Sequence, residues 1–140
     1  AGWLAMFTLA VIARTTTGVY LENPRLAAVG VKLVKEAVAL ARARGIALVD
    51  QSPIAVVSVD AAATPSAAAE ILRDIGRNLI AQAPQHRMSA LQDFDAGRRL
   101  EVHETLGYAW RESQRLGLAA PTMELCYELV SGLDSLPRGS

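Results

Sequence analysis

Cysteine is almost absent from this chain, because Cys126 is the only one in 140 residues. A single cysteine excludes a disulfide within the chain and any metal site built from several cysteines. It suits a reducing compartment, so we expect a cytoplasmic protein. His86 and His103 have no cysteine or carboxylate at ligand spacing around them, and we therefore expect no metal site.

Net charge is also absent, since 14 Lys and Arg residues balance 14 Asp and Glu residues. Only 5% of the residues are aromatic, and no basic patch is interleaved with aromatic side chains. A neutral chain of this kind lacks the field that attracts nucleic acid or an anionic membrane. We expect neither as a partner.

Long apolar runs are missing as well. The longest, Trp3 to Ala13, is about half of the ~20 residues that a membrane span requires. No basic residue precedes it, so it is a poor secretory signal, and a buried helix is the better interpretation. Because the chain begins without methionine inside this helix, we expect an excised domain or the second half of a longer protein.

What is abundant is alanine and leucine, in a chain that is 51% hydrophobic. This composition favours helices, and no segment pairs with another at the period of two that marks a sheet. We predict an all-α bundle of about five to seven helices. It spans residues 1–136 as one domain, with residues 137–140 as a tail.

Proline, glycine and capping residues predict where the helices begin and end. A helix from Trp3 to Thr17 is expected to stop at Gly18. Asn23 and Pro24 begin the next, which Gly45 ends. A third runs from Thr64-Pro65 to Pro84. The segment from Ile46 to Ala63 contains IAVVSV, which has strand composition but no partner strand, so we predict helix or irregular structure there.

The stretch from Ser89 to Val130 carries three further helix signals. Ser89 and Gln92 form a capping box, and Gly97 offers a bend. The next helix has an apolar stripe at Val102, Leu106, Ala109 and Leu116, and closes at Gly117. A third opens at Pro121 with the stripe Thr122, Leu125, Cys126, Leu129, Val130 and Leu133.

The same stretch resembles the C-terminal domain of ketopantoate reductases. The pattern is S-x-L-Q-D-x-x-x-G-R-x-x-E, then a glycine in the next helix, then L-G-L-x-x-P-T. In this chain it consists of Ser89, Leu91, Gln92, Asp93, Gly97, Arg98, Glu101, Gly107, Leu116, Gly117, Leu118, Pro121 and Thr122. The resemblance extends more weakly back to the Trp3 helix.

The resemblance implies an NADPH-dependent oxidoreductase of pantothenate biosynthesis that converts a 2-keto acid to a 2-hydroxy acid. In the family an N-terminal Rossmann domain binds NADPH, and the helical domain supplies substrate and acid–base residues. No G-x-G-x-x-G motif follows a strand here, so the Rossmann domain is absent from this chain. We expect no cofactor to bind the chain alone.

The resemblance also assigns site residues. The family's first C-terminal helix carries Lys-x-x-x-Asn-x-x-x-Asn on one face, which lines the cleft. Alignment puts Leu4, Thr8 and Ile12 at these positions, with Thr8 where an asparagine helps to hold the substrate. Leucine cannot deliver the proton that the lysine supplies, so activity is expected to be altered or lost.

Two further positions keep the family residue. Ser89 corresponds to the serine that binds the substrate carboxylate or a neighbouring hydroxyl, and a helix start favours an anion there. Its alternative role is a helix N-cap alone. Glu101 corresponds to the active-site glutamate beside the lysine and the nicotinamide ribose. Its alternative is a solvated helix residue beside Arg98 or Arg99.

A second functional hypothesis remains open, in which the chain is a non-catalytic helical module for homodimerisation or for binding a partner. The replaced Lys-x-x-x-Asn-x-x-x-Asn face favours this module. A Rossmann domain encoded upstream of Ala1 would favour the reductase, whose partners are a small 2-keto acid and that domain.

Overall fold

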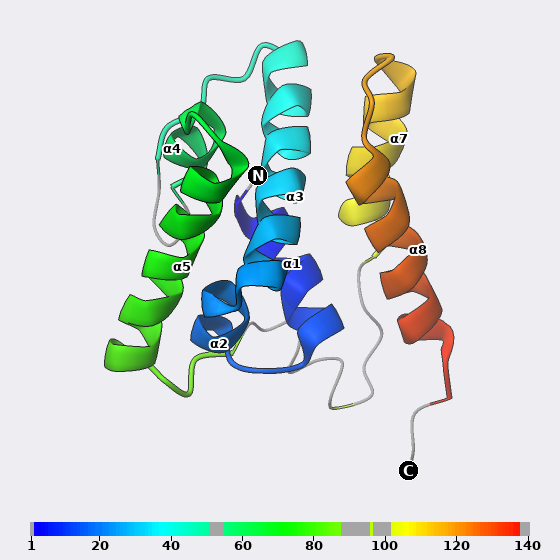
Figure 1. Cartoon of the computed structure of the whole chain (residues 1–140). Coiled ribbons are helices and arrows are strands. Elements are labelled where there is room, and N and C mark those ends of the chain that lie inside the picture. Colours follow the sequence, from blue (N-terminus) through cyan, green and yellow to red (C-terminus); the bar gives the residue numbers. More distant parts are fainter. Residues whose placement is uncertain (1, 51–54, 88–95, 97–101, 138–140) are drawn as a thin grey trace.

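The computed structural model describes residues 2–50, 55–87, 96 and 102–137 (Figure 1). These residues form seven helices and no strand, which confirms the all-α prediction. The helices are α1 (Gly2–Ala13), α2 (Thr17–Glu22), α3 (Pro24–Ala43), α4 (Val56–Ala61), α5 (Pro65–Gln82), α7 (Leu106–Arg115) and α8 (Pro121–Ser135). None of the helices in this described part is both long and apolar enough to cross a membrane.

Helix α3 is the centre of the bundle, because it packs against each of the other six described helices. Its start follows the prediction: the Asn23 side chain accepts hydrogen bonds from the backbone N–H groups of Arg25 at 3.0 Å and Leu26 at 3.1 Å. Its end does too, since Gly45 has a φ of 72°, which glycine adopts without strain. Eight of its residues are buried: Ala27, Gly30, Val31, Leu33, Val34, Ala37, Val38 and Leu40.

The predicted stop at Gly18 is wrong. Helix α1 ends at Ala13, Arg14 takes a positive φ of 54°, and Gly18 is the second residue of α2. Glycine is needed there because α2 crosses α5 at very short range. A Cβ on Gly18 would lie 2.9 Å from the backbone nitrogen of Ile80, and a Cβ on Gly76 would lie 2.5 Å from the backbone nitrogen of Glu22.

The segment from Ile46 to Ala63 contains no strand among its described residues, as predicted, and residues 51–54 lie outside them. Asp50 Oδ1 accepts hydrogen bonds from the backbone N–H groups of Val57 at 2.8 Å and Ser58 at 3.1 Å. These bonds satisfy donors at the start of α4 that would otherwise be unpaired. The apolar residues Val56 and Val59 are buried, so the valine-rich run is a short helix with one core face.

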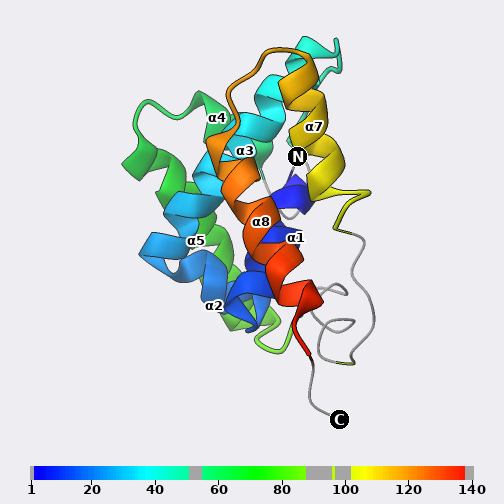
Figure 2. The same ribbon diagram turned by 90° about the vertical axis from the view of Figure 1, so that its right-hand side faces the viewer.

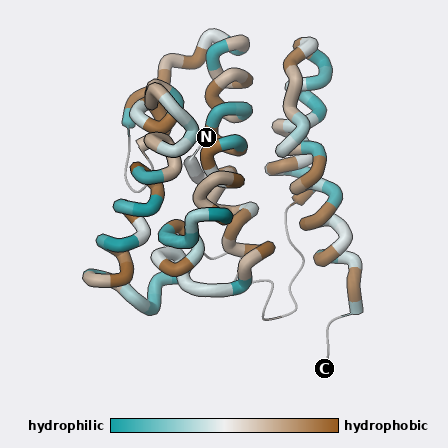
Figure 3. The backbone as a smooth tube through the Cα atoms, in the orientation of Figure 1, coloured by the Kyte–Doolittle hydropathy of each residue, from teal (hydrophilic) through white to brown (hydrophobic). Residues whose placement is uncertain are grey.

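Helix α5 begins where Thr64-Pro65 predicts it, and the Thr64 hydroxyl accepts a hydrogen bond from the Ala67 backbone N–H at 3.1 Å. The segment after α5 returns to α2. Thr17 Oγ1 lies 2.7 Å from His86 Nδ1, and the Thr17 backbone N–H donates to the His86 carbonyl at 2.8 Å. In Figure 3, hydrophobic and hydrophilic residues alternate along α3 and α5, as helices with one buried face require.

Helices α7 and α8 lie side by side in both views and form a pair beside the other five helices (Figures 1 and 2). Gly117, with a φ of 72°, closes α7 as predicted. The predicted stripe of α8 is only partly right. Met123, Cys126 and Val130 are buried, but Leu125 and Leu129 are 61% and 47% exposed.

Candidate functional site

Thr8, the predicted substrate contact on α1, lies in the hydrophobic core with no exposed surface. Its hydroxyl donates a hydrogen bond to the Leu4 carbonyl at 2.9 Å, one turn earlier in the same helix. Buried threonines often satisfy their hydroxyl in this way. A ligand that contacted Thr8 would have to enter the core and replace this bond, and the role of Thr8 stays a prediction.

The same helical face is also packed at Leu4, which is 9% exposed. Ile12, the third aligned position, is half-buried and lines a groove described below. According to the family resemblance, Leu4, Thr8 and Ile12 face a cleft. Of these three residues, only Ile12 is partly exposed in the structure. Ser89 and Glu101 lie outside the described residues, so their roles stay predictions.

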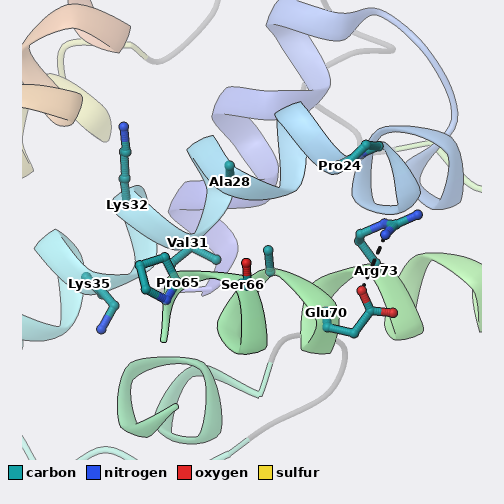
Figure 4. A pocket seen from close by; sticks show the side chains of 10 residues that line it. Pro24, Ala28, Val31, Lys32, Lys35, Pro65, Ser66, Glu70 and Arg73 are labelled. Atoms are coloured by element: carbon teal, nitrogen blue, oxygen red, sulfur yellow. Dashed lines mark hydrogen bonds and ion pairs between the residues drawn. The ribbon is translucent and has the colours of Figure 1, made fainter. Parts of the chain in front are cut away.

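One hollow lies between α3 and α5 (Figure 4), and we call it the α3–α5 groove. It has a volume of about 400 Å³. Its lining is Pro24, Ala28, Val31, Lys32, Lys35, Pro65, Ser66, Ala69, Glu70 and Arg73. Figure 4 shows the two lysines extending from α3 and the Arg73–Glu70 ion pair on α5.

Most of the charged side chains that line the α3–α5 groove already bind other groups of the chain. Arg73 pairs with Glu70 at 3.3 Å and with Glu22 at 3.0 Å. Lys35 Nζ donates to the Asp60 carbonyl at 3.3 Å. Lys32 is exposed and makes no hydrogen bond or ion pair with any residue that the structure describes.

A larger hollow lies on the other side of α3, between α1, α3 and α8, with a volume of about 560 Å³. We call it the α1–α3–α8 groove. Apolar side chains from all three helices form its walls: Leu9, Ile12, Leu26, Val29, Leu125 and Leu129. Lys32, Glu36 and Thr122 supply its polar groups, and Cys126 also lines it.

Glu36 joins α3 to the first turn of α8. Its carboxylate accepts hydrogen bonds from the backbone N–H groups of Thr122 at 3.0 Å and Met123 at 2.8 Å. The residue at the N-cap position, Ala120, has no side chain that could accept these bonds. Glu36 thus replaces the missing cap, and its negative charge lies at the positive end of the α8 dipole.

Cys126 is buried at 3% exposure and lies in the wall of the same groove. Burial, together with the negative charge of Glu36, raises the pKa of the Cys126 thiol from 9.0 to about 11. The thiol is therefore protonated at neutral pH, and a neutral thiol is a poor nucleophile and a poor metal ligand. This agrees with the place of Cys126 in the apolar stripe predicted for this helix.

A cluster of polar and aromatic side chains lies where α7 begins. His103 Nδ1 is 2.5 Å from Tyr127 Oη, and the two rings meet edge to face with centroids 5.6 Å apart. Trp110 packs on Tyr127 at the same centroid distance, and Arg111 donates to the His103 carbonyl at 2.9 Å. A Cβ on Gly107 would lie 2.8 Å from the Tyr127 ring, so glycine permits this packing.

Sequence reasoning missed the partners of both histidines and the role of Glu36. His86 bonds Thr17, and His103 bonds Tyr127, across 69 and 24 positions. Glu36 and Met123 are 87 positions apart. The local sequence gives one signal for the role of Glu36. Helix α8 begins at a proline with no capping residue before it, so an acceptor from elsewhere in the chain has to satisfy the backbone N–H groups of its first turn.

Comparison with known proteins identifies relatives at the level of family and fold. The C-terminal domain of ketopantoate reductase PanE/ApbA matches residues 3–134. A dimeric ketopantoate reductase from Staphylococcus aureus superimposes with a TM-score of 0.67 at 15% identity, over 95% of this chain and 40% of that one. A PanE/ApbA-family ketopantoate reductase from Ralstonia eutropha JMP134 gives 0.68 at 22%, over 95% and 38%. No curated protein sequence matches the chain.

Proposed function

The chain belongs to the ketopantoate reductase family, in which it corresponds to the C-terminal domain, and we propose that it is the helical domain of an NADPH-dependent reductase of 2-keto acids. The match over residues 3–134 carries this proposal. The chain spans about two-fifths of the length of the two solved relatives. The rest of such an enzyme is a Rossmann domain, to which we assign NADPH binding.

The proposed chemistry is hydride transfer from NADPH to the carbonyl carbon, with a proton delivered to the carbonyl oxygen. We assign the substrate carboxylate to Ser89, and Glu101 to the proton-transfer step. Leu4 stands where the family has its lysine, and its side chain holds no proton to give. Among the residues assigned to the site, Glu101 is then the titratable group that is left, and the reaction is expected to be slower than with a lysine acid.

Thr8 belongs to this proposal only as a second substrate contact. Its hydroxyl is buried and bonded to the Leu4 carbonyl. Thr8→Val keeps the shape of the side chain and removes the hydroxyl. If Thr8 contacts the substrate in the full-length enzyme, this variant raises KM and leaves the melting temperature nearly unchanged.

Ser89 offers the sharper test, because its two roles respond differently to substitution. In the full-length protein, Ser89→Asp keeps a good N-cap, so stability should stay within about 1 kcal/mol, whereas Ser89→Ala should lose about 1 kcal/mol. The aspartate would repel a keto-acid carboxylate, and alanine would only weaken its binding. We expect Asp to abolish substrate affinity and Ala to reduce it. Unchanged keto-acid affinity in the aspartate variant removes Ser89 from the site.

A non-catalytic helical module is the second candidate function. The observation that favours it is the burial of Leu4 and Thr8 on α1, at positions where the family carries site residues that face a cleft. The relative from S. aureus is dimeric, so we propose homodimerisation as the form such a module takes. Sedimentation of the chain distinguishes a dimer from a monomer, and NADPH oxidation by the full-length protein distinguishes an enzyme from a module.

A further inference from the structure

We propose that the α1–α3–α8 groove binds an aliphatic carboxylate, with its hydrocarbon chain along the apolar walls and its carboxylate group paired with Lys32. Of the described residues at the aligned site positions, Ile12 lines the groove and Leu4 and Thr8 do not. Binding of the carboxylate to the chain itself tests the inference without any measurement of reductase activity.

The apolar walls are the first observation. Leu125 and Leu129 are one helical turn apart on α8 and are 61% and 47% exposed, although they face a groove that Leu9 and Leu26 also line. Large apolar side chains that converge from separate helices on one hollow are typical of ligand sites. A hydrocarbon chain in the groove would remove these surfaces from water, which is the main favourable term in apolar binding.

The size of the groove supports a small molecule. Its volume of about 560 Å³ falls within the range of roughly 300–1,000 Å³ that is usual for ligand pockets. Its walls come from three helices, α1, α3 and α8.

The polar groups decide the charge of the ligand. Glu36 directs its carboxylate to the backbone N–H groups of Thr122 and Met123, so its charge is offset by the start of α8. The Cys126 thiol is neutral, because burial raises its pKa to about 11. Lys32 is left as the charged group of the lining without a partner among the described residues.

The ligand that matches these features has an apolar body and a negatively charged end. An amphiphile with an ammonium end would meet the like charge of Lys32. An alcohol of the same length would fill the walls but lose the ion pair. Lys32 also borders the α3–α5 groove, so the position of the hydrocarbon chain, and not of the carboxylate alone, identifies the site.

Octanoate is the probe, titrated into the ¹⁵N-labelled chain and followed by amide chemical shifts. We expect saturable shifts at the α1–α3–α8 groove, at Val29, Leu125 and Leu129, and none at Ser66 and Ala69 of the α3–α5 groove. Octanol should bind at least tenfold more weakly than octanoate, and octylammonium more weakly still.

Two pairs of variants test the assignment. Lys32→Ala should weaken octanoate binding at least tenfold, whereas Lys35→Ala, three residues along the same helix, should leave it unchanged. Leu129→Glu should abolish binding by placing a polar, negative side chain in the wall. Leu136→Glu is its control, since Leu136 is 58% exposed and is not among the groove-lining residues. Thermal melts confirm that each variant is folded.

Four results would overturn the proposal. The first is the absence of saturable shifts with octanoate. The second is equal weakening by Lys32→Ala and Lys35→Ala, and the third is shifts confined to the α3–α5 groove. The fourth is sedimentation of the chain as a dimer that Leu129→Glu converts to a monomer, because the exposed leucines would then be an interface between copies of the chain.

Discussion

Glu36 and Met123 are 87 positions apart in the sequence, yet the Glu36 carboxylate accepts a hydrogen bond from the Met123 backbone N–H at 2.8 Å. The bond, with its companion at Thr122, links the central helix α3 to the pair formed by α7 and α8. It lets a helix that begins with Ala120-Pro121 start without a local cap.

Glu36→Ala should therefore lower the free energy of unfolding by about 2 kcal/mol, the usual size for hydrogen bonds to a charged group. Glu36→Gln keeps an acceptor oxygen and should lose less. Glu124, which is exposed in the first turn of the same helix, supplies the control. Glu124→Ala removes only a favourable interaction with the helix dipole, worth at most about 1 kcal/mol. Urea denaturation measures all three, and equal losses for Glu36→Ala and Glu124→Ala would contradict the capping role.

The crossing of α2 and α5 gives a second prediction. A methyl group at Gly76 would lie 2.5 Å from the Glu22 backbone nitrogen and 2.8 Å from the Gly18 carbonyl oxygen, so the helices would have to separate. We expect Gly76→Ala to destabilise the chain by about 1–3 kcal/mol, as overpacking does.

Gly132 is the matched control for Gly76, because it is also inside a helix, but a methyl group there would have no described atom within 4 Å apart from its own stretch of helix. Gly132→Ala should stabilise the chain by roughly 0.5–1 kcal/mol, since alanine favours a helix over glycine. Melting temperatures that move in the same direction for both variants would mean that α2 and α5 do not cross at this short range.

Much of the fold follows from local sequence, because its causes are local. Asn23-Pro24, Thr64-Pro65, Gly45 and Gly117 each set a helix end through their own backbone or a cap within three residues. The prediction for Gly18 is wrong because the role of this glycine depends on a distant helix and not on local sequence. A glycine that ends a helix and one that permits close packing look alike in sequence, and only the position of α5 separates them.

The candidate site is less predictable, because its groups come from distant helices. Leu125 and Leu129 belong to the predicted apolar stripe of α8, yet they are exposed and line a groove. The face of α8 that packs against α1 and α3 is narrower than the stripe. Lys32 has no motif around it that would single it out. Ser89, Glu101 and Thr8 follow from a family resemblance, which predicts roles but not the burial of Thr8.

Burial of Leu4 leads to a third prediction, in which Leu4→Lys strongly destabilises the chain. Leu4 is 9% exposed, so a lysine there would bury an ammonium group without a partner, at a cost of several kcal/mol. Leu129→Lys places the same side chain at a 47% exposed position of α8 and should change stability by about 0.5 kcal/mol or less. A Leu4→Lys variant that melts at the original temperature would show that this face of α1 is open to solvent.

Stability should also fall in alkali, through Tyr20 and Cys126. Burial raises the pKa of Tyr20 from 10.0 to about 12, and burial with Glu36 raises the pKa of Cys126 from 9.0 to about 11. Below pH 9 both groups hold their protons in the folded and the unfolded chain, so their contribution is fully present. As pH rises from 9 to 12 the unfolded chain loses these protons first, and folding is progressively disfavoured.

Urea denaturation at pH 8.5 and pH 10.5 measures this loss. A Tyr20→Phe, Cys126→Ala double variant should lose less stability between the two pH values than the original chain. At pH 8 the Cys126 thiol should react with a disulfide reagent only in denaturant. An unchanged pH dependence in the double variant would assign the alkaline loss to other groups.

The most direct test of the reductase proposal follows a single hydrogen atom. The full-length protein is incubated with NADPH deuterated at the transferable position of the nicotinamide and with ketopantoate or another 2-keto acid, and the product is analysed by mass spectrometry. We predict a 2-hydroxy acid with deuterium at C2, formed at a lower rate by Glu101→Gln and at an unchanged rate by Glu104→Gln. An absence of deuterated 2-hydroxy acid from every 2-keto acid, with the protein folded and NADPH bound, would contradict the proposal.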